Sequence, residues 1–388
     1  MRFRLRCILH LVVVSAAAAQ ERSPGSVAIP PSVVAAVRQY MDAQRIPGLS
    51  IAVGQGSRVV WAEGFGSADL EHQITVTPTT LFLLQSTQKI LTATAVLRLA
   101  QLGKLKLDDP VQRYCAAFGV RPWPVTLRQL LSHQGGIRQS DLSDLFNQDH
   151  YVSAEAALRR FSRDSLQVEP GTQVVYSNAG YTLLACAIEG ASRQPYDSAL
   201  AHLVLEPAGM RATRSDNVYE VVLERARYYV VRTAANTEQW KGLWTAAHLV
   251  STPLDRPANA DQVDPSWAIG AGNYLGTPAD LLRFGMALTE RRLLRGSYRD
   301  SSFVEAQLTE TQKKSGRALG GWPASSDGVF QMLGSSWNGS FALAIKPSTG
   351  VVVAVGSNIE FDQPADLLTR IIDAWSRTAP GQETSPGR

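Results

Sequence analysis

The stretch from Ser86 to Gly103, STQKILTATAVLRLAQLG, predicts one long helix that begins at a reactive serine. From Ile90 onward this run carries a single charge, Arg98, and it stops at a glycine, a residue that favours helix C-termini. A helix that is apolar nearly all round belongs in a protein core. Ser86 and Lys89 are three residues apart and share a helix face, so the lysine amine is expected beside the serine oxygen.

This pairing has a chemical meaning because a serine hydroxyl is a poor nucleophile at neutral pH until a nearby base activates it. If Ser86 is the first helical residue, the helix dipole and the unpaired N–H groups favour the negative charge that develops during attack. Tyr176-Ser177-Asn178 follows about ninety residues later, and no other Ser-x-x-Lys occurs in the chain. A four-residue pattern alone is common in exposed first turns, so the prediction of acyl transfer depends on the whole order.

The first nineteen residues predict a secretory signal peptide. Three arginines form a basic n-region, Ile8–Val14 is a short apolar h-region, and Ala17-Ala18-Ala19 is a small-residue cleavage site before Gln20. The apolar run is too short to span a bilayer, and Cys7 precedes it, which disfavours a lipid anchor. We expect an exported protein, periplasmic or secreted, without stable membrane insertion after cleavage near Ala19. The alternative is an uncleaved N-terminal anchor.

Charge and composition exclude several partners and cofactors. Removing three arginines leaves 35 basic against 34 acidic residues, a net charge of +1. A near-neutral surface argues against nucleic acid or anionic membrane, which leaves a small-molecule or peptide substrate. The spacing of the His, Cys, Asp and Glu residues does not indicate a metal site, and we expect no cofactor. The oligomeric state has no sequence signal.

Two cysteines remain after the signal peptide, Cys115 and Cys186. Export permits a disulfide, but two cysteines are too few for a disulfide framework. Cys186 also lies in the apolar stretch YTLLACAIEGA. We therefore expect two small buried thiols.

Strands are expected near both ends of the chain. Two hairpins are predicted, one from Leu49–Val53 and Val59–Phe65 around Gly54-Gln55-Gly56-Ser57, the other from Phe341–Ile345 and Val351–Val355. Helices are predicted at Ser32–Gln44 and Pro364–Ser376.

The expected fold class is α/β (α+β) in two parts. An antiparallel sheet flanked by helices would come from about 20–88 and 290–377, and a large, mostly helical insert from about 89–289. A site is expected where the two parts meet. Residues 378–388 read as a disordered tail.

Ser86-Thr87-Gln88-Lys89 followed by Tyr176-Ser177-Asn178 resembles the motif order of the serine β-lactamase and penicillin-binding fold, specifically its class C-like branch. That branch includes class C β-lactamases, D-alanyl peptidases, several esterases and the mitochondrial serine β-lactamase-like proteins, whose peptidase group is the most similar in RARYYVV and SWAIGAGNYLGTPADLLRFG. Class A enzymes use Ser-Asp-Asn where this chain has Tyr176-Ser177-Asn178, so the tyrosine argues against that branch. The motifs that carry the likeness include IPGLSIAV, FGSADLE, GKLKLDDPV, TLRQLLSHQGGIR, PGTQVVYSNAGYTLL and EPAGM.

The resemblance implies a role for each site residue. Ser86 would be the nucleophile, Lys89 its activating partner, and Tyr176 the general acid/base that passes a proton to the leaving group. Asn178 would bind the substrate, and the backbone N–H groups of Ser86 and Ser335 would form the oxyanion hole. The alternative for Tyr176 and Asn178 is a capped turn, with Asn178 as the N-cap of a helix over Ala179–Ser192.

The third motif of the family departs from its usual form. Where relatives have Lys-Thr-Gly or His-x-Gly, this chain has Met332-Leu333-Gly334, followed by Ser335-Ser336-Trp337. Gly334, Ser335 and Trp337 are expected to contact substrate. The missing cation disfavours acidic β-lactams and peptides that end in a free carboxylate. If another cation serves the site, Arg138 is the first candidate.

Other motifs add little. His133 is expected to be structural, and Asn338-Gly339-Ser340 fits a glycosylation acceptor by coincidence. Gly-x-Ser-x-Gly, His-Glu-x-x-His and a phosphate loop are absent from the sequence. We therefore expect a metal-free serine hydrolase acting through an acyl-enzyme on an amide or ester, of peptidase or esterase type. A true β-lactamase or D-alanyl carboxypeptidase is one alternative. The other is a non-catalytic pseudoenzyme that binds peptide or cell-wall fragments.

Overall fold

The computed structural model describes residues 29–246, 248–294, 319, 328–336, 339–360 and 364–376. The signal-peptide prediction for residues 1–19, the tail at 378–388, Trp337 and Asn338 lie outside the described residues. Within the described residues, no helix combines the length and the apolar character needed to cross a membrane.

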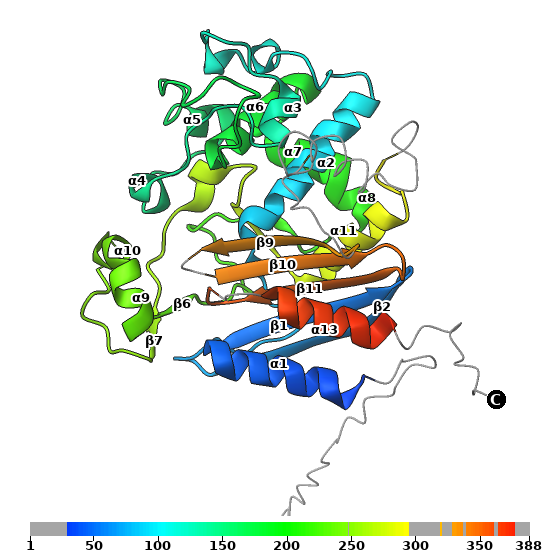
Figure 1. Cartoon of the computed structure of the whole chain (residues 1–388), viewed down its shortest axis with the longest axis vertical. Coiled ribbons are helices and arrows are strands. Elements are labelled where there is room, and N and C mark those ends of the chain that lie inside the picture. Colours follow the sequence, from blue (N-terminus) through cyan, green and yellow to red (C-terminus); the bar gives the residue numbers. More distant parts are fainter. Residues whose placement is uncertain are drawn as a thin grey trace, which may run out of the picture.

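A six-stranded antiparallel sheet joins the two ends of the chain, as the α/β expectation requires (Figure 1). Strand β1 pairs with β11 from Leu49 opposite Ser357 to Gln55 opposite Val351, so N-terminal and C-terminal hairpins meet at the centre. Both predicted hairpins are present, and the first turns tightly at Gly56-Ser57 because β1 runs on to Gln55. The sheet order is β3-β2-β1-β11-β10-β9, with bounds β1 Gly48–Gln55, β2 Arg58–Asp69, β3 Ile74–Thr75, β9 Phe330–Ser336, β10 Gly339–Lys346 and β11 Val351–Ser357.

Helices cover both faces of this sheet. On one face lie α1 (Pro31–Gln44) and α13 (Pro364–Ser376), which contact each other and lie in front of the sheet in Figure 1. On the other lies α11 (Pro278–Thr289), which contacts β1 and β11 although it falls inside the range expected for the helical insert. Along β1, Ile51 packs in the core beneath the terminal helices and Ala52 in the opposite core. The strand is therefore buried on both sides, in keeping with its mainly apolar sequence.

The helical part lies beyond β9 in Figure 1 and is built around two long helices, α2 (Gln88–Gln101) and α6 (Asn178–Ser192), which contact each other. Short helical segments surround them: η1 Gln85–Thr87, η2 Val111–Arg113, η3 Ala116–Phe118, α3 Leu127–Leu131, α4 Leu142–Leu145, α5 Ala154–Leu158, α7 Tyr196–Leu200, η4 Ala201–Leu205, α8 Glu206–Ala208 and η5 Pro265–Ala268.

Several short strands were not expected, because two or three residues carry no visible alternation. A three-stranded sheet has the order β4-β8-β5, and β6 pairs with β7 beside two small helices. Their bounds are β4 Phe82–Leu83, β5 Arg214–Ser215, β6 Tyr229–Val231, β7 Pro257–Asn259, β8 Tyr274–Gly276, α9 Ala234–Gln239 and α10 Lys241–Ala246.

The starts of α2 and α6 differ from the sequence expectation by one or two residues. Ser86 lies in the 3-10 turn η1, and the α-helix begins two residues later at Gln88. The N-cap of α6 is Ser177, whose hydroxyl accepts the N–H of Gly180 at 3.0 Å, so the prediction of Asn178 as the cap was wrong. Because Ser177 takes the capping role, the Asn178 side chain is available for other contacts.

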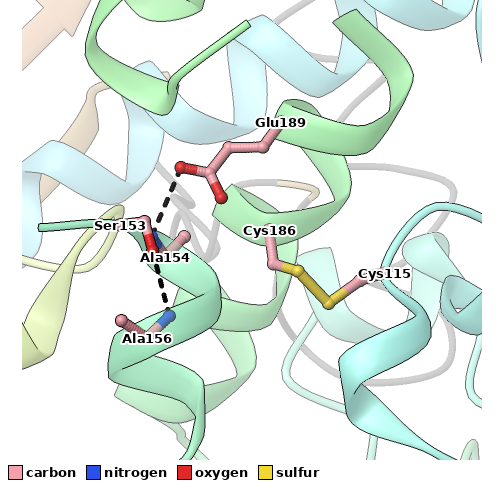
Figure 2. The surroundings of a disulfide bond; sticks show 6 residues. All are labelled: Cys115, Ser153, Ala154, Ala156, Cys186 and Glu189. Atoms are coloured by element: carbon pink, nitrogen blue, oxygen red, sulfur yellow. Dashed lines mark hydrogen bonds between the residues drawn. A yellow bond between two sulfur atoms is a disulfide. The ribbon is translucent and has the colours of Figure 1, made fainter. Parts of the chain in front are cut away.

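The prediction of two buried thiols was wrong, because Cys115 and Cys186 form a disulfide (Figure 2). Both residues are buried, as expected, and their Cα atoms are 5.6 Å apart across 71 residues of sequence. The bond ties the residue that precedes η3 to the middle of α6. The disulfide thus links the loop that carries Cys115 to α6, the helix whose first residue is Asn178.

Removing this bond should destabilise the protein by about 2–5 kcal/mol, because a long unfolded loop is no longer closed. Urea unfolding of the Cys115→Ser/Cys186→Ser double variant should show a lower midpoint than the wild type. The matched control is the same variant with reductant, whose midpoint should not move further. A wild-type midpoint that reductant leaves unchanged, or two free thiols found after unfolding, would contradict the disulfide.

Candidate active site

The nucleophile candidate sits on a strained turn. Gln85, directly before Ser86, has a φ of 51°, a left-handed conformation that non-glycine residues adopt at a cost. Gly272 packs against this residue, and a Cβ there would lie 3.2 Å from the Gln85 carbonyl carbon. The surrounding packing thus holds the turn that presents the half-buried Ser86 side chain.

Lys89 is completely buried, yet its amine has three hydrogen-bond acceptors. Nζ donates to Ser86 Oγ at 3.0 Å, to Asn178 Oδ1 at 2.7 Å and to the carbonyl oxygen of Ala271 at 2.9 Å. Burial lowers the pKa of Lys89 below its usual value, and the neighbouring Tyr176 opposes that shift. A lysine with a lowered pKa is suited to exchange a proton with a serine hydroxyl.

Tyr176 completes a triangle around the serine oxygen. Its Oη lies 2.5 Å from Ser86 Oγ, and Lys89 Nζ lies 4.9 Å from the centre of its ring. Ser86 Oγ is therefore within hydrogen-bond reach of both groups, although Tyr176 is 90 residues away from Ser86 in the sequence. This is the geometry that proton transfer to and from a serine needs.

Asn178 is held in one orientation. Its Oδ1 accepts from Lys89, and its Nδ2 donates to Ser140 Oγ at 3.2 Å. An amide nitrogen carries two hydrogens, so one remains for a ligand. Asn178 lines the cleft beside Ser86, where that hydrogen can meet a substrate carbonyl.

The third motif lies on β9, directly against the nucleophile turn. A Cβ at Gly334 would come within 2.6 Å of the Ser86 nitrogen and 2.4 Å of the Leu84 carbonyl oxygen, so only glycine fits. Met332 is 5% exposed and packs in the large core, and it is not among the described residues that line the cleft. Ser335 does line the cleft, and its hydroxyl lies 2.6 Å from that of Ser340.

The cleft itself has a volume of about 100 Å³ and none of its described lining side chains is charged. Arg138, the alternative cation, is already engaged by Asp144 at 2.7 Å and Asp164 at 2.6 Å, and these carboxylates raise its pKa. The described lining residues are Leu83, Gln85, Ser86, Leu145, Asn178, Val263, Pro265, Trp267, Ala268, Ala271, Gly272, Ser335 and Ser336.

Among the described residues, one group has ligand atoms close enough together for a metal ion: Asp69, Glu71 and His72, all within 4.8 Å. It lies at the end of β2, with Glu71 and His72 exposed. Asp69 pairs with His72 at 2.8 Å, and Glu71 pairs with Arg227 at 3.1 Å. These contacts account for the cluster without an ion.

Sequence reasoning named Ser86, Lys89, Tyr176 and Asn178, and the structure brings their side chains together. It missed the Ala271 carbonyl, which as a backbone atom leaves no residue-type signal. It also missed Ser140, whose contact with Asn178 spans 38 residues.

The chain matches the family described as Beta-lactamase over residues 33–374. The human serine β-lactamase-like protein LACTB, mitochondrial, is 27% identical over 321 residues, which cover 65% of this chain and 55% of that protein. The chain thus spans about half the length of the curated relatives it matches.

Solved structures share the fold. A D-amino acid amidase from Ochrobactrum anthropi SV3, complexed with L-phenylalanine, has a TM-score of 0.71 at 23% identity, over 89% of this chain and 99% of that one. EstCE1, described as a hydrolase with promiscuous acyltransferase activity, has a TM-score of 0.68 at 21% identity, over 88% of this chain and 97% of that one. The family match extends through both hairpins and the whole helical part, so this chain belongs to the β-lactamase family.

Proposed function

We propose that this protein is a serine hydrolase that cleaves neutral esters or amides through an acyl-enzyme on Ser86. The observation that carries the proposal is the position of Ser86 Oγ, 2.5 Å from Tyr176 Oη and 3.0 Å from Lys89 Nζ. A serine so placed can lose its proton as it attacks. Membership of the β-lactamase family and a fold shared with an amidase and EstCE1 support the same class of reaction.

In the proposed mechanism, Tyr176 acts as the phenolate, whose negative charge the nearby Lys89 ammonium offsets. Ser86 Oγ forms a bond to the substrate carbonyl carbon while its proton passes to Tyr176 Oη. The carbonyl electron pair moves onto oxygen, which the N–H groups of Ser86 and Ser335 would hold. When the tetrahedral intermediate collapses, the bond to the leaving group breaks and Tyr176 returns the proton to it. Water then repeats these steps against the acyl-enzyme and frees Ser86.

The uncharged cleft favours neutral substrates. Its described lining has no lysine, arginine or histidine to pair with a substrate carboxylate, and Arg138 is held by aspartates. Peptidase or esterase activity in the class C-like branch is therefore proposed ahead of β-lactamase or D-alanyl carboxypeptidase activity. The intact triangle around Ser86 disfavours a pseudoenzyme that only binds peptide or cell-wall fragments.

We also propose that the protein works outside the cytoplasm, after cleavage near Ala19, and without a metal in the reaction. The N-terminal pattern and a disulfide between Cys115 and Cys186 support export, because such bonds persist in oxidising compartments. Ser86, Lys89 and Tyr176 together supply a nucleophile and a route for its proton, so the proposed acyl transfer does not call on a metal ion.

Ser86→Ala should abolish turnover and covalent labelling by a fluorophosphonate, because the change removes the oxygen that forms the acyl bond. The fold should persist, since one atom is lost from a half-buried side chain. Ser57→Ala, at the exposed turn between β1 and β2, is the matched control and should label normally. Labelling of Ser86→Ala at the wild-type rate would end the assignment.

Lys89→Met and Tyr176→Phe should each slow acylation by roughly 10²–10⁴, the usual effect of losing a positioned proton-transfer group. Because both groups contact the same oxygen, the double variant should be little slower than either single variant. Single-turnover kinetics with an activated ester give the acylation rates of the two single variants and the double variant. If the two losses multiply in full, Lys89 and Tyr176 do not share one proton route.

A neutral ester should be turned over about ten- to a hundred-fold better in kcat/KM than a carboxylate-bearing analogue with the same leaving group. That ratio corresponds to one missing charge-assisted contact. Met332→Lys should narrow the preference by improving the acidic substrate. Met332→Leu, an apolar exchange of similar volume, is the control and should leave the preference unchanged. Native enzyme that prefers the carboxylate, with no response to the lysine, would refute the neutral-substrate proposal.

A further inference from the structure

The segment from Ser132 to Ser140 wraps around the Tyr176-Ser177-Asn178 motif. Besides the contact of Ser140 with Asn178, the carbonyl oxygen of Arg138 accepts the Ser177 hydroxyl at 2.7 Å. Arg138 is in turn fixed by its ion pairs with Asp144 and Asp164. The motif is therefore held from one side by a segment that is itself anchored.

Within this segment, His133 forms hydrogen bonds with the residues directly before and after Tyr176. Its backbone oxygen accepts the N–H of Val175 at 2.8 Å, and its Nδ1 accepts the N–H of Ser177 at 3.2 Å. The two residues on either side of Tyr176 are thus bound to the same histidine. The neutral ring with its proton on Nε2 is the tautomer that can accept the Ser177 N–H.

The ring of His133 also packs against the tyrosine ring. The two ring centres are 4.5 Å apart at a tilt of 34°, and the ring of Tyr181 lies 5.1 Å away from His133. His133 is 2% exposed and holds a left-handed backbone, with φ at 58°. A bulky residue in this conformation costs free energy, so the surrounding contacts must fix it there.

We propose that His133 is a positioning residue that holds the Tyr176 hydroxyl within reach of Ser86 Oγ. The inference rests on the proposed function, in which Tyr176 carries the proton. Tyr176 is half-buried, and its Oη must stay 2.5 Å from the serine oxygen although it lies at the end of a long side chain. His133 fixes both the backbone on each side of the tyrosine and one side of its ring. It exchanges no proton with the substrate.

Two variants test separately the hydrogen bond to the Ser177 N–H and the contact with the Tyr176 ring. His133→Phe keeps an aromatic ring but loses the acceptor for the Ser177 N–H. His133→Asn keeps a side-chain acceptor and tolerates the left-handed backbone, but loses the ring. His248→Asn is the matched control, since His248 is also a histidine in the left-handed conformation, with a φ of 56°, but is exposed.

The experiment measures acylation by an activated neutral ester under single-turnover conditions, in the wild type and in Tyr176→Phe. Rates are expressed per fluorophosphonate-labelled site, so that unfolded protein does not count. Each His133 variant should acylate about 10- to 100-fold more slowly than the wild type, the usual effect of misplacing a reacting group. In the Tyr176→Phe background the same change should cost less than about twofold, because there is no hydroxyl left to position. His248→Asn should match the wild type.

A purely structural histidine would slow both backgrounds by the same factor, and that result overturns the inference. Acylation at the wild-type rate by both His133 variants would also overturn the inference. If His133→Phe fails to fold, His133→Asn alone decides between these outcomes. A native enzyme that is not labelled at Ser86 refutes the proposed function and the inference with it. A native enzyme labelled at Ser86, with unaffected His133 variants, leaves the function standing.

Discussion

The complete burial of Lys89 is the constraint on which the site depends. An amine removed from water is costly unless its hydrogens are bound, and Lys89 finds its acceptors on three different segments. One is the nucleophile turn, one is the start of α6, and one is the turn after η5 that carries Ala271. These segments are far apart in sequence, so the three hydrogen bonds of a single amine link them at the site.

The sequence predicted the elements whose signals are local. The paired hairpins, the terminal helices and the Ser-x-x-Lys spacing all follow from patterns within one short window, and each is present. The Cys115–Cys186 bond could not be predicted, because pairing depends on the distance between segments that only the fold brings together. The capping of α6 was misassigned because Ser177 and Asn178 are both strong cap residues and stand side by side. The contacts of His133 had no signal because they form across 44 residues.

The third motif shows two requirements that the family normally meets with neighbouring residues. The steric requirement is retained, since Gly334 lets β9 pass against the Ser86 nitrogen where a Cβ would collide with the backbone. The electrostatic requirement is not retained, since Met332 packs in the core instead of presenting a cation. The two can be lost separately because glycine determines how closely the backbones approach, whereas a cation acts through its charge. Under the proposed function, this chain keeps the backbone geometry of the site and accepts neutral rather than acidic substrates.

The left-handed backbone at Gln85 has a consequence for anyone who engineers this protein. Strain of this kind costs about 1–3 kcal/mol, so a design method that scores thermal stability alone would replace Gln85 with glycine. The residue after Gln85 is the proposed nucleophile, and a looser turn would let its oxygen move away from Tyr176. Heat resistance and catalytic rate thus make opposite demands on this position, and consensus or computational stabilisation should leave it fixed while it improves the surface and the helix ends elsewhere.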